Sequence, residues 1–129
     1  MSDIKQVIVM RTDLNMRKGK MISQGAHAAM MFLTKELARA SRESSAVPTW
    51  SAAQSAWMLG NFKKITVGIG SEVELMDIFE KAQQAKLDVH LCVDNGLTEF
   101  KGVPTRTCLA IGPDQAEIID QITGALKLL

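Results

Sequence analysis

Apolar and polar positions along the chain follow two kinds of pattern. Residues 4–10 (IKQVIVM) form an apolar, largely β-branched run, which predicts a strand buried on both faces of a sheet. Runs at 63–69 and 89–93 predict two further strands, and a fourth strand is expected at 107–111.

The first two of these strands are separated by segments with apolar residues at three- and four-residue spacing, which is typical of helices. The longest helix is predicted from 20 to about 42, followed by a break at 44–48 and a short helix at 51–59. The predicted apolar face of the longest helix consists of Ile22, Ala26, Ala29, Met30, Leu33 and Leu37.

Two more helices are expected in the second half of the chain. Ser71 begins one of them, with Glu74 in the capping-box position, and this helix ends near Lys86. The tripeptide Gly-Pro-Asp at 112–114 predicts the start of the last helix, which ends at 123–124.

Strands that alternate with helices predict an α/β protein whose sheet contains at least one parallel pair. The strands at 89–93 and 107–111 are joined by a loop too short for a helical crossover, so this pair is expected to be antiparallel. The fold class is therefore a three-layer α/β/α sandwich with a mixed four-stranded sheet. A chain of 129 residues, 47% of them hydrophobic, fits one domain that spans 1–129.

Charge is unevenly distributed although the net charge is only +1. Ten Lys/Arg and four Asp/Glu occur up to residue 64, whereas five Lys/Arg and ten Asp/Glu follow. This asymmetry predicts a basic surface in the first half, suited to a polyanion such as RNA. The alternative is that these charges only solvate helix faces.

Targeting and redox signals are sparse. No apolar stretch approaches the ~20 residues of a membrane span, and no basic leader with a cleavage site begins the chain, so we expect a soluble, cytoplasmic protein without membrane contact. Cys92 and Cys108 lack CxxC spacing and a nearby His pair, which predicts buried reduced thiols rather than a zinc site or a disulfide.

Two loops at strand ends carry the candidate chemistry, because open α/β sheets bind ligands there. The first loop, RTDLNMRKGK at 11–20, supplies Arg11, Arg17, Lys18 and Lys20, and free N–H groups at the start of the next helix suit an anion. Lys20, Gln24 and His27 share one helical stripe. A solvated helix face is the alternative interpretation of this stripe.

The second loop begins at Asp94, where the third predicted strand ends. Gly96 permits a tight turn and Thr98 adds a hydroxyl, while a plain Asx-turn is the alternative. Serine-hydrolase, zinc-protease, dinucleotide and NTPase motifs are absent, which favours metal-free chemistry without a cofactor. Lys20 near Asp94 would keep the carboxylate ionised to orient or deprotonate a water, directly or through Thr98, while Lys20 and helix N–H groups stabilise an oxyanion.

The whole pattern resembles the type 2 peptidyl-tRNA hydrolases, the archaeal and eukaryotic type. Asp94, Gly96 and Thr98 match the family's Asp-Ala-Gly-x-Thr-Gln segment, 107–113 matches its Thr-Val-Leu-x-Ile-Gly-Pro strand, and 118–129 matches its C-terminal helix and tail. The opening signature is matched, in order and spacing, by Arg11, Asp13, Leu14, Met16, Lys18, Gly19, Lys20, Gln24, His27 and Ala28.

The resemblance implies hydrolysis of the ester between a peptide and the 3′ end of tRNA, with no metal, no cofactor and frequent homodimers. It implies that Lys20, Asp94 and Thr98 are catalytic, and that peptidyl-tRNA is the partner. The substrate-binding residues that it implies or places nearby are Arg11, Arg17, Lys18, Gln24, His27 and Thr107.

Some positions depart from the family pattern. Arg17 replaces the usual glycine, Asn95 the usual alanine, and Glu99 the usual glutamine. The added charge of Glu99 is expected to raise the pKa of a carboxylate such as Asp94, or to repel phosphate. The segment 41–62 also matches poorly, and we expect either a packed connector with core tryptophans or a lid that contacts tRNA.

Two other functions remain open at this point. A binding module with the same fold but no activity would explain Glu99, although it would not need to keep Lys20, Asp94 and Thr98 together. A small regulatory domain that binds a metabolite would explain the fold but not the basic first loop.

Overall fold

A computed structural model describes residues 3–43 and 46–129, so Ser44 and Ser45 within the predicted break lie outside the described residues. None of the helices described is long and apolar enough to cross a membrane. The elements are β1 (Ile4–Arg11), α1 (Lys18–Arg42), α2 (Ala52–Leu59), β2 (Lys64–Ile69), α3 (Glu72–Gln84), β3 (Val89–Asp94), β4 (Thr105–Gln115) and α4 (Ala116–Thr123).

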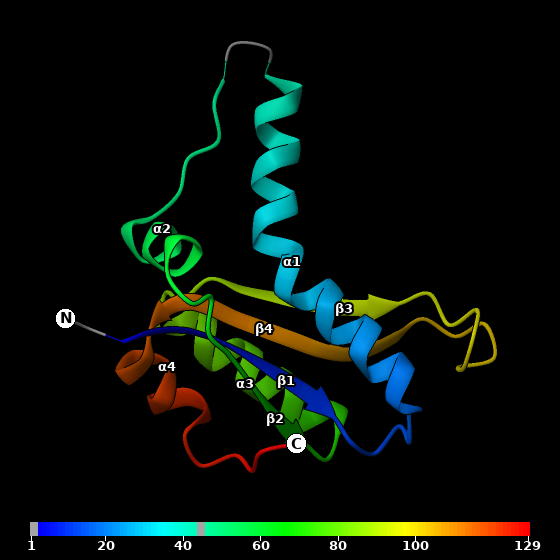
Figure 1. The fold of residues 1–129 in the computed structure, drawn as a ribbon. Helices are drawn as coiled ribbons and strands as arrows, with labels where there is room; N and C mark the ends of the chain where they lie inside the picture. The colour runs from blue at the N-terminus through cyan, green and yellow to red at the C-terminus, as the bar shows by residue number, and fades with distance from the viewer. Residues whose placement is uncertain (1–2, 44–45) are drawn as a thin grey trace.

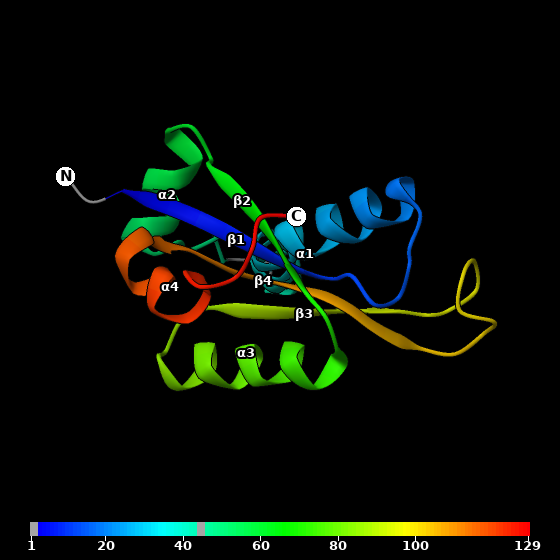
Figure 2. The same cartoon turned by 90° about the horizontal axis from the view of Figure 1, so that it is seen from below.

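The four strands form one mixed sheet in the order β2-β1-β4-β3. β1 and β2 are parallel, and β4 is antiparallel to both β1 and β3, which confirms the predicted antiparallel pair. β1, β2 and β3 therefore run in the same direction and their carboxyl ends share one edge of the sheet. Figures 1 and 2 show the start of α1 and the loop after β3 at this same edge.

Helices cover both faces of the sheet, as expected for a three-layer sandwich. α1 and α2 lie on one face and α3 and α4 on the other (Figure 1). Val7 and Val9 of β1 pack on the side of α3 and α4, whereas Ile8 and Met10 pack towards α1. The continuous apolar run of β1 is thus explained by burial on both faces.

The predicted apolar face of α1 is wrong for most of its residues, although Ala29 does pack against the core. Ile22, Met30 and Leu37 are 72%, 54% and 45% exposed. The helix packs through small residues instead, because Gly25 and Ala28 let its backbone lie close to the sheet. The buried residues of α1 are Gln24, Gly25, Ala28, Phe32 and Ala40.

The tripeptide at 112–114 does not begin the last helix, as the sequence predicted. It lies inside β4, where Asp114 pairs with Lys5, and α4 begins two residues later. Gly112 has a φ of +88°, and a Cβ there would lie 2.8 Å from the backbone nitrogen of Asp114. Pairing with β1 therefore carries the strand past a sequence that, by itself, predicts a helix start.

The capping prediction at α3 is half right. The Ser71 hydroxyl accepts a hydrogen bond from the Glu74 N–H at 3.1 Å, as a helix cap should. The Glu74 carboxylate accepts from the N–H of Gly70 at 3.2 Å, rather than from that of Ser71.

The segment 46–62 is held against α1 by aromatic rings, which favours the packed connector over the lid. The ring of Trp57 is buried, lies edge-on to Phe32 with centroids 5.7 Å apart, and donates from Nε1 to the Lys63 carbonyl at 2.9 Å. Trp50 also packs edge-on against Phe32 at 6.2 Å. Such edge-to-face pairs contribute to stability beyond the apolar area that they bury.

Candidate active site

The structure brings Lys20, Asp94 and Thr98 into direct contact. The Lys20 Nζ donates to Asp94 Oδ1 at 2.8 Å and to Thr98 Oγ1 at 2.7 Å. Lys20 lies in the first turn of α1, Asp94 ends β3, and Thr98 lies in the loop at 95–104. The shared edge of the sheet thus joins residues that are 74 positions apart in the sequence.

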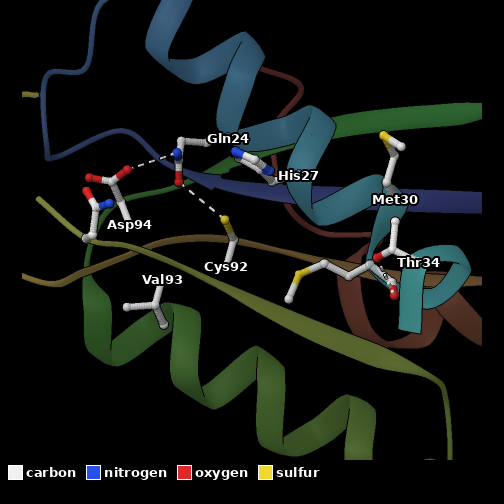
Figure 3. A pocket seen from close by; sticks show the side chains of 9 residues that line it. Gln24, His27, Met30, Thr34, Cys92, Val93 and Asp94 are labelled. Carbon is white, nitrogen blue, oxygen red and sulfur yellow. Dashed lines mark hydrogen bonds between the residues drawn. The ribbon is translucent and has the colours of Figure 1, made fainter. Parts of the chain in front are cut away.

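Gln24, one turn beyond Lys20 on α1, adds a further donor to the carboxylate. Its Nε2 donates to Asp94 Oδ1 at 3.2 Å (Figure 3). Its Oε1 accepts from the buried Thr107 hydroxyl at 2.6 Å and from the Cys92 thiol at 3.3 Å. These two donors from β3 and β4 fix the amide so that its nitrogen faces Asp94.

The second oxygen of Asp94 closes the turn that follows β3. Asp94 Oδ2 accepts from the Gly96 N–H at 2.8 Å, so the Asx-turn and the Lys20 contact use the same carboxylate. Gly96 has a φ of +85°, and a Cβ there would lie 2.3 Å from the Val103 carbonyl oxygen. Glycine is required at this position because any side chain would displace the loop.

These contacts keep Asp94 ionised. The hydrogen bond from Lys20 lowers the pKa of Asp94 most strongly, burial opposes this shift, and the bonds from Gly96 and Gln24 lower the pKa further. A carboxylate with a lowered pKa is a weak base, although it still accepts hydrogen bonds from water. The arrangement therefore suits the orientation of a water better than the removal of its proton.

Glu99 is not among the groups that shift the pKa of Asp94. That pKa is lowered, chiefly by the hydrogen bond from Lys20, so the raised pKa is not found, and the expected repulsion of phosphate stays a prediction. Glu99 Oε1 lies 3.8 Å from the Arg17 Nε, and the Glu99 side chain is 22% exposed. Arg17 and Glu99, both departures from the family pattern, thus offset each other's charge across the mouth of the site.

The remaining cations of the first loop occupy two different environments. Arg17 and Lys18 are exposed at the start of α1. Arg11 is buried, and its guanidinium donates to both carboxylate oxygens of Asp13 and to the Arg106 carbonyl at 3.0 Å. The contacts of Arg11 join the end of β1 to the start of β4, which makes it a positioning residue for this edge of the sheet.

His27 lies on the exposed side of α1, one turn beyond Gln24, and lines a cavity next to Asp94 (Figure 3). Among residues 3–43 and 46–129, no group of three His, Cys, Asp or Glu side chains is placed to hold a metal ion.

Sequence reasoning missed two contacts at this site. Cys92 was expected to be a buried reduced thiol, and it is free and buried, but its thiol also donates a hydrogen bond to Gln24. The spacing of two between Cys92 and Asp94 along one strand was the available signal. Phe100 was not singled out, yet the Lys20 Nζ lies 5.8 Å from the centre of its ring.

The fold and the site together define a three-layer α/β protein with a Lys–Asp–Thr cluster at the carboxyl ends of its strands. Comparison with known proteins identifies its family. The family model described as peptidyl-tRNA hydrolase PTH2 matches residues 4–129. A peptidyl-tRNA hydrolase of Methanocaldococcus jannaschii is 40% identical over 126 residues, covering 98% of this chain and 100% of that protein. A peptidyl-tRNA hydrolase of Staphylothermus marinus is 41% identical over 128 residues, covering 99% and 97%.

The chain therefore belongs to the PTH2 family of peptidyl-tRNA hydrolases. A solved structure of a protein of unknown function from Agrobacterium shares the fold, with a TM-score of 0.59, 14% identity, and coverage of 100% of this chain and 99% of that one.

Replacing Thr107 with valine is expected to lower the free energy of unfolding by about 1–2 kcal/mol, because the buried Gln24 Oε1 loses its shorter hydrogen bond. Urea unfolding measures this difference. Thr105→Val is the matched control, since the Thr105 hydroxyl donates to the Val103 carbonyl in an exposed position on the same strand. Equal effects of the two substitutions would show that the hydrogen bond to Gln24 stabilises the fold no more than the exposed hydrogen bond of Thr105 does.

Proposed function

We propose that the protein hydrolyses peptidyl-tRNA at the ester between the peptide, or an N-acylated amino acid, and the tRNA 3′ end, and so recycles tRNA. The hydrogen-bonded cluster of Lys20, Asp94 and Thr98 supports this proposal most directly, in a chain that belongs to a family of such hydrolases. We also propose these three residues as the catalytic ones.

The mechanism follows from the hydrogen bonds that remain free. An ammonium group has three donors, and Lys20 uses two of them on Asp94 and Thr98. The third donor is available to the carbonyl oxygen of the ester, where negative charge develops as water attacks. The uncapped N–H groups at the start of α1 add to this stabilisation.

Asp94 is proposed to bind the attacking water, and Thr98 the leaving oxygen. Asp94 accepts a hydrogen bond from the attacking water and orients it towards the carbonyl carbon. A bond then forms between the water oxygen and that carbon, the bond to the ribose 3′ oxygen breaks, and a water proton ends on this leaving oxygen. Thr98 accepts from Lys20, so its own hydroxyl hydrogen is free to reach the leaving oxygen.

The tRNA is proposed to lie across the start of α1, at the exposed Arg17 and Lys18. Phosphate contacts of this kind carry no base information, which suits an enzyme that accepts many tRNAs. Gln24 and Thr107 are then positioning residues that act through Asp94, Arg11 holds the sheet edge, and His27 is left to contact the substrate.

The binding module without activity remains the alternative. Glu99 was its main support. The ion pair with Arg17 weakens that support, because a cation next to the Glu99 carboxylate reduces its repulsion of tRNA phosphates.

We further propose a cytoplasmic homodimer. Its support is a groove of about 300 Å³ between α1 and β2, lined by apolar side chains that include the exposed Ile22 and Leu129.

Asp94→Asn is expected to lower kcat for release of tRNA from N-acetylaminoacyl-tRNA about a hundredfold or more, because the neutral amide accepts more weakly from water. Wild-type turnover should persist in EDTA, since no step uses a metal. Asp77→Asn is the control, because Asp77 pairs with Lys81 on α3, on the opposite face of the sheet. Full activity of a folded Asp94→Asn would contradict the mechanism, and a folded wild type that binds tRNA without cleaving it would favour the binding module.

Lys18→Ala is expected to weaken tRNA binding and to reduce the slope of log Kd against log salt by roughly one. Arg17→Ala should have a smaller effect, because Glu99 already offsets part of the Arg17 charge. Glu99→Gln should strengthen binding. Filter binding over a salt series measures all three, with Lys81→Ala on α3 as the control, and a salt-independent Kd would remove this surface from the tRNA site.

A further inference from the structure

A cavity of about 400 Å³ extends away from Asp94 between α1 and β3. Gln24, His27 and Asp94 form its polar end. Its other lining is largely apolar and includes Met30, Met31 and Val93. Figure 3 shows Gln24, His27, Met30 and Thr34 following one another along α1, opposite the strand that carries Cys92 and Val93.

The charges around this cavity separate two parts of the substrate. No lysine or arginine is among the described residues that line it, and its polar end holds the ionised Asp94. Asp94 already occupies the nearest ammonium group, that of Lys20, so a phosphate placed in this partly buried cavity would meet a carboxylate and no free cation among the residues that line it. The exposed cations Arg17 and Lys18 lie at the other side of the site, at the start of α1.

The ester itself must lie at Lys20 and Asp94, so the two halves of the substrate leave it in different directions. The polyanionic half fits the start of α1. The peptide half, whose backbone is uncharged, fits the cavity, which runs towards Thr34. At a rise of 1.5 Å per residue, the ten residues from Gln24 to Thr34 span about 15 Å, which is room for about four extended residues.

The apolar lining also suits a ligand of variable shape. Met30 is 54% exposed, and methionine side chains are flexible and polarisable, so they adapt to side chains of different size. His27 adds a hydrogen-bonding ring at the polar end. A hydrolase that must accept any peptide needs a subsite of this tolerant kind.

We infer that the cavity between α1 and β3 is the peptide subsite, which binds up to about four C-terminal residues of the peptidyl group through His27, Met30, Met31 and Val93. This inference rests on the proposed function and adds the direction in which the substrate lies. It also assigns to Met30 and Thr34 an influence on which peptides are cleaved fastest.

The test compares two substrates made on one tRNA, N-acetylglycyl-tRNA and a tetrapeptidyl-tRNA with leucine side chains. Thr34→Trp fills the far end of the cavity, and it should lower kcat/KM roughly tenfold for the tetrapeptide but less than about twofold for N-acetylglycine. Leu37→Trp is the matched control, because Leu37 follows Thr34 by three residues on α1 and is not among the residues that line the cavity. It should leave both values unchanged.

A second variant and a second readout keep the result interpretable. Met30→Ala removes apolar contact without adding bulk, and should lower kcat/KM for the tetrapeptide roughly fivefold with little change for N-acetylglycine. Inhibition by deacylated tRNA should be unchanged in both variants, since that molecule carries no peptide.

Three outcomes would overturn the inference. An equal loss of kcat/KM on both substrates, or no loss on either, would show that the cavity does not bind the peptide. Weaker inhibition by deacylated tRNA in Thr34→Trp would assign the cavity to the terminal nucleotide instead. Failure of the wild type to cleave either substrate would overturn the proposed function, and this inference with it, which is a result distinct from the first two.

Discussion

The contact between Lys20 and Asp94 is the interaction on which the rest of the site depends. It joins the first turn of α1 to the end of β3 through a 2.8 Å hydrogen bond between side chains that are 13% and 10% exposed. Because the lysine lowers the pKa of the carboxylate, Asp94 stays charged while it is shielded from water. The same ammonium group fixes Thr98, so one cation sets the positions of both oxygen-bearing partners.

The fold makes this contact possible by bringing strand ends and a helix start to one edge. β1 and β3 point the same way, and α1 packs close above the sheet because its buried face is built from Gly25 and Ala28. The anchoring of Gln24 by Cys92 and Thr107 then depends on the pairing of β3 with β4, so the site uses both strands of the hairpin.

The order and type of the elements could be predicted because buried strands and amphipathic segments leave clear patterns, and the meeting of Lys20 with Asp94 followed from the rule that ligands bind at strand ends. The buried face of α1 could not be predicted from the sequence, because small residues such as Gly25 and Ala28 give a weak hydrophobic signal although they pack closely. The end of β4 was missed because pairing with β1 overrides a local helix-start sequence. The hydrogen bonds from Thr107 and Cys92 to Gln24 depend on strand register, which no single segment encodes.

A double-mutant cycle on hydrolysis of N-acetylaminoacyl-tRNA tests the central claim most directly, with Lys20→Ala, Asp94→Ala and the variant that carries both. If the two residues act as one unit, the double variant should lose about as much kcat/KM as the more damaging single variant. Lys18→Ala combined with Asp94→Ala serves as the comparison, and there the separate losses should multiply. If the losses in kcat/KM of Lys20→Ala and Asp94→Ala also multiply in the double variant, the result would contradict the account, because the two residues would then act independently.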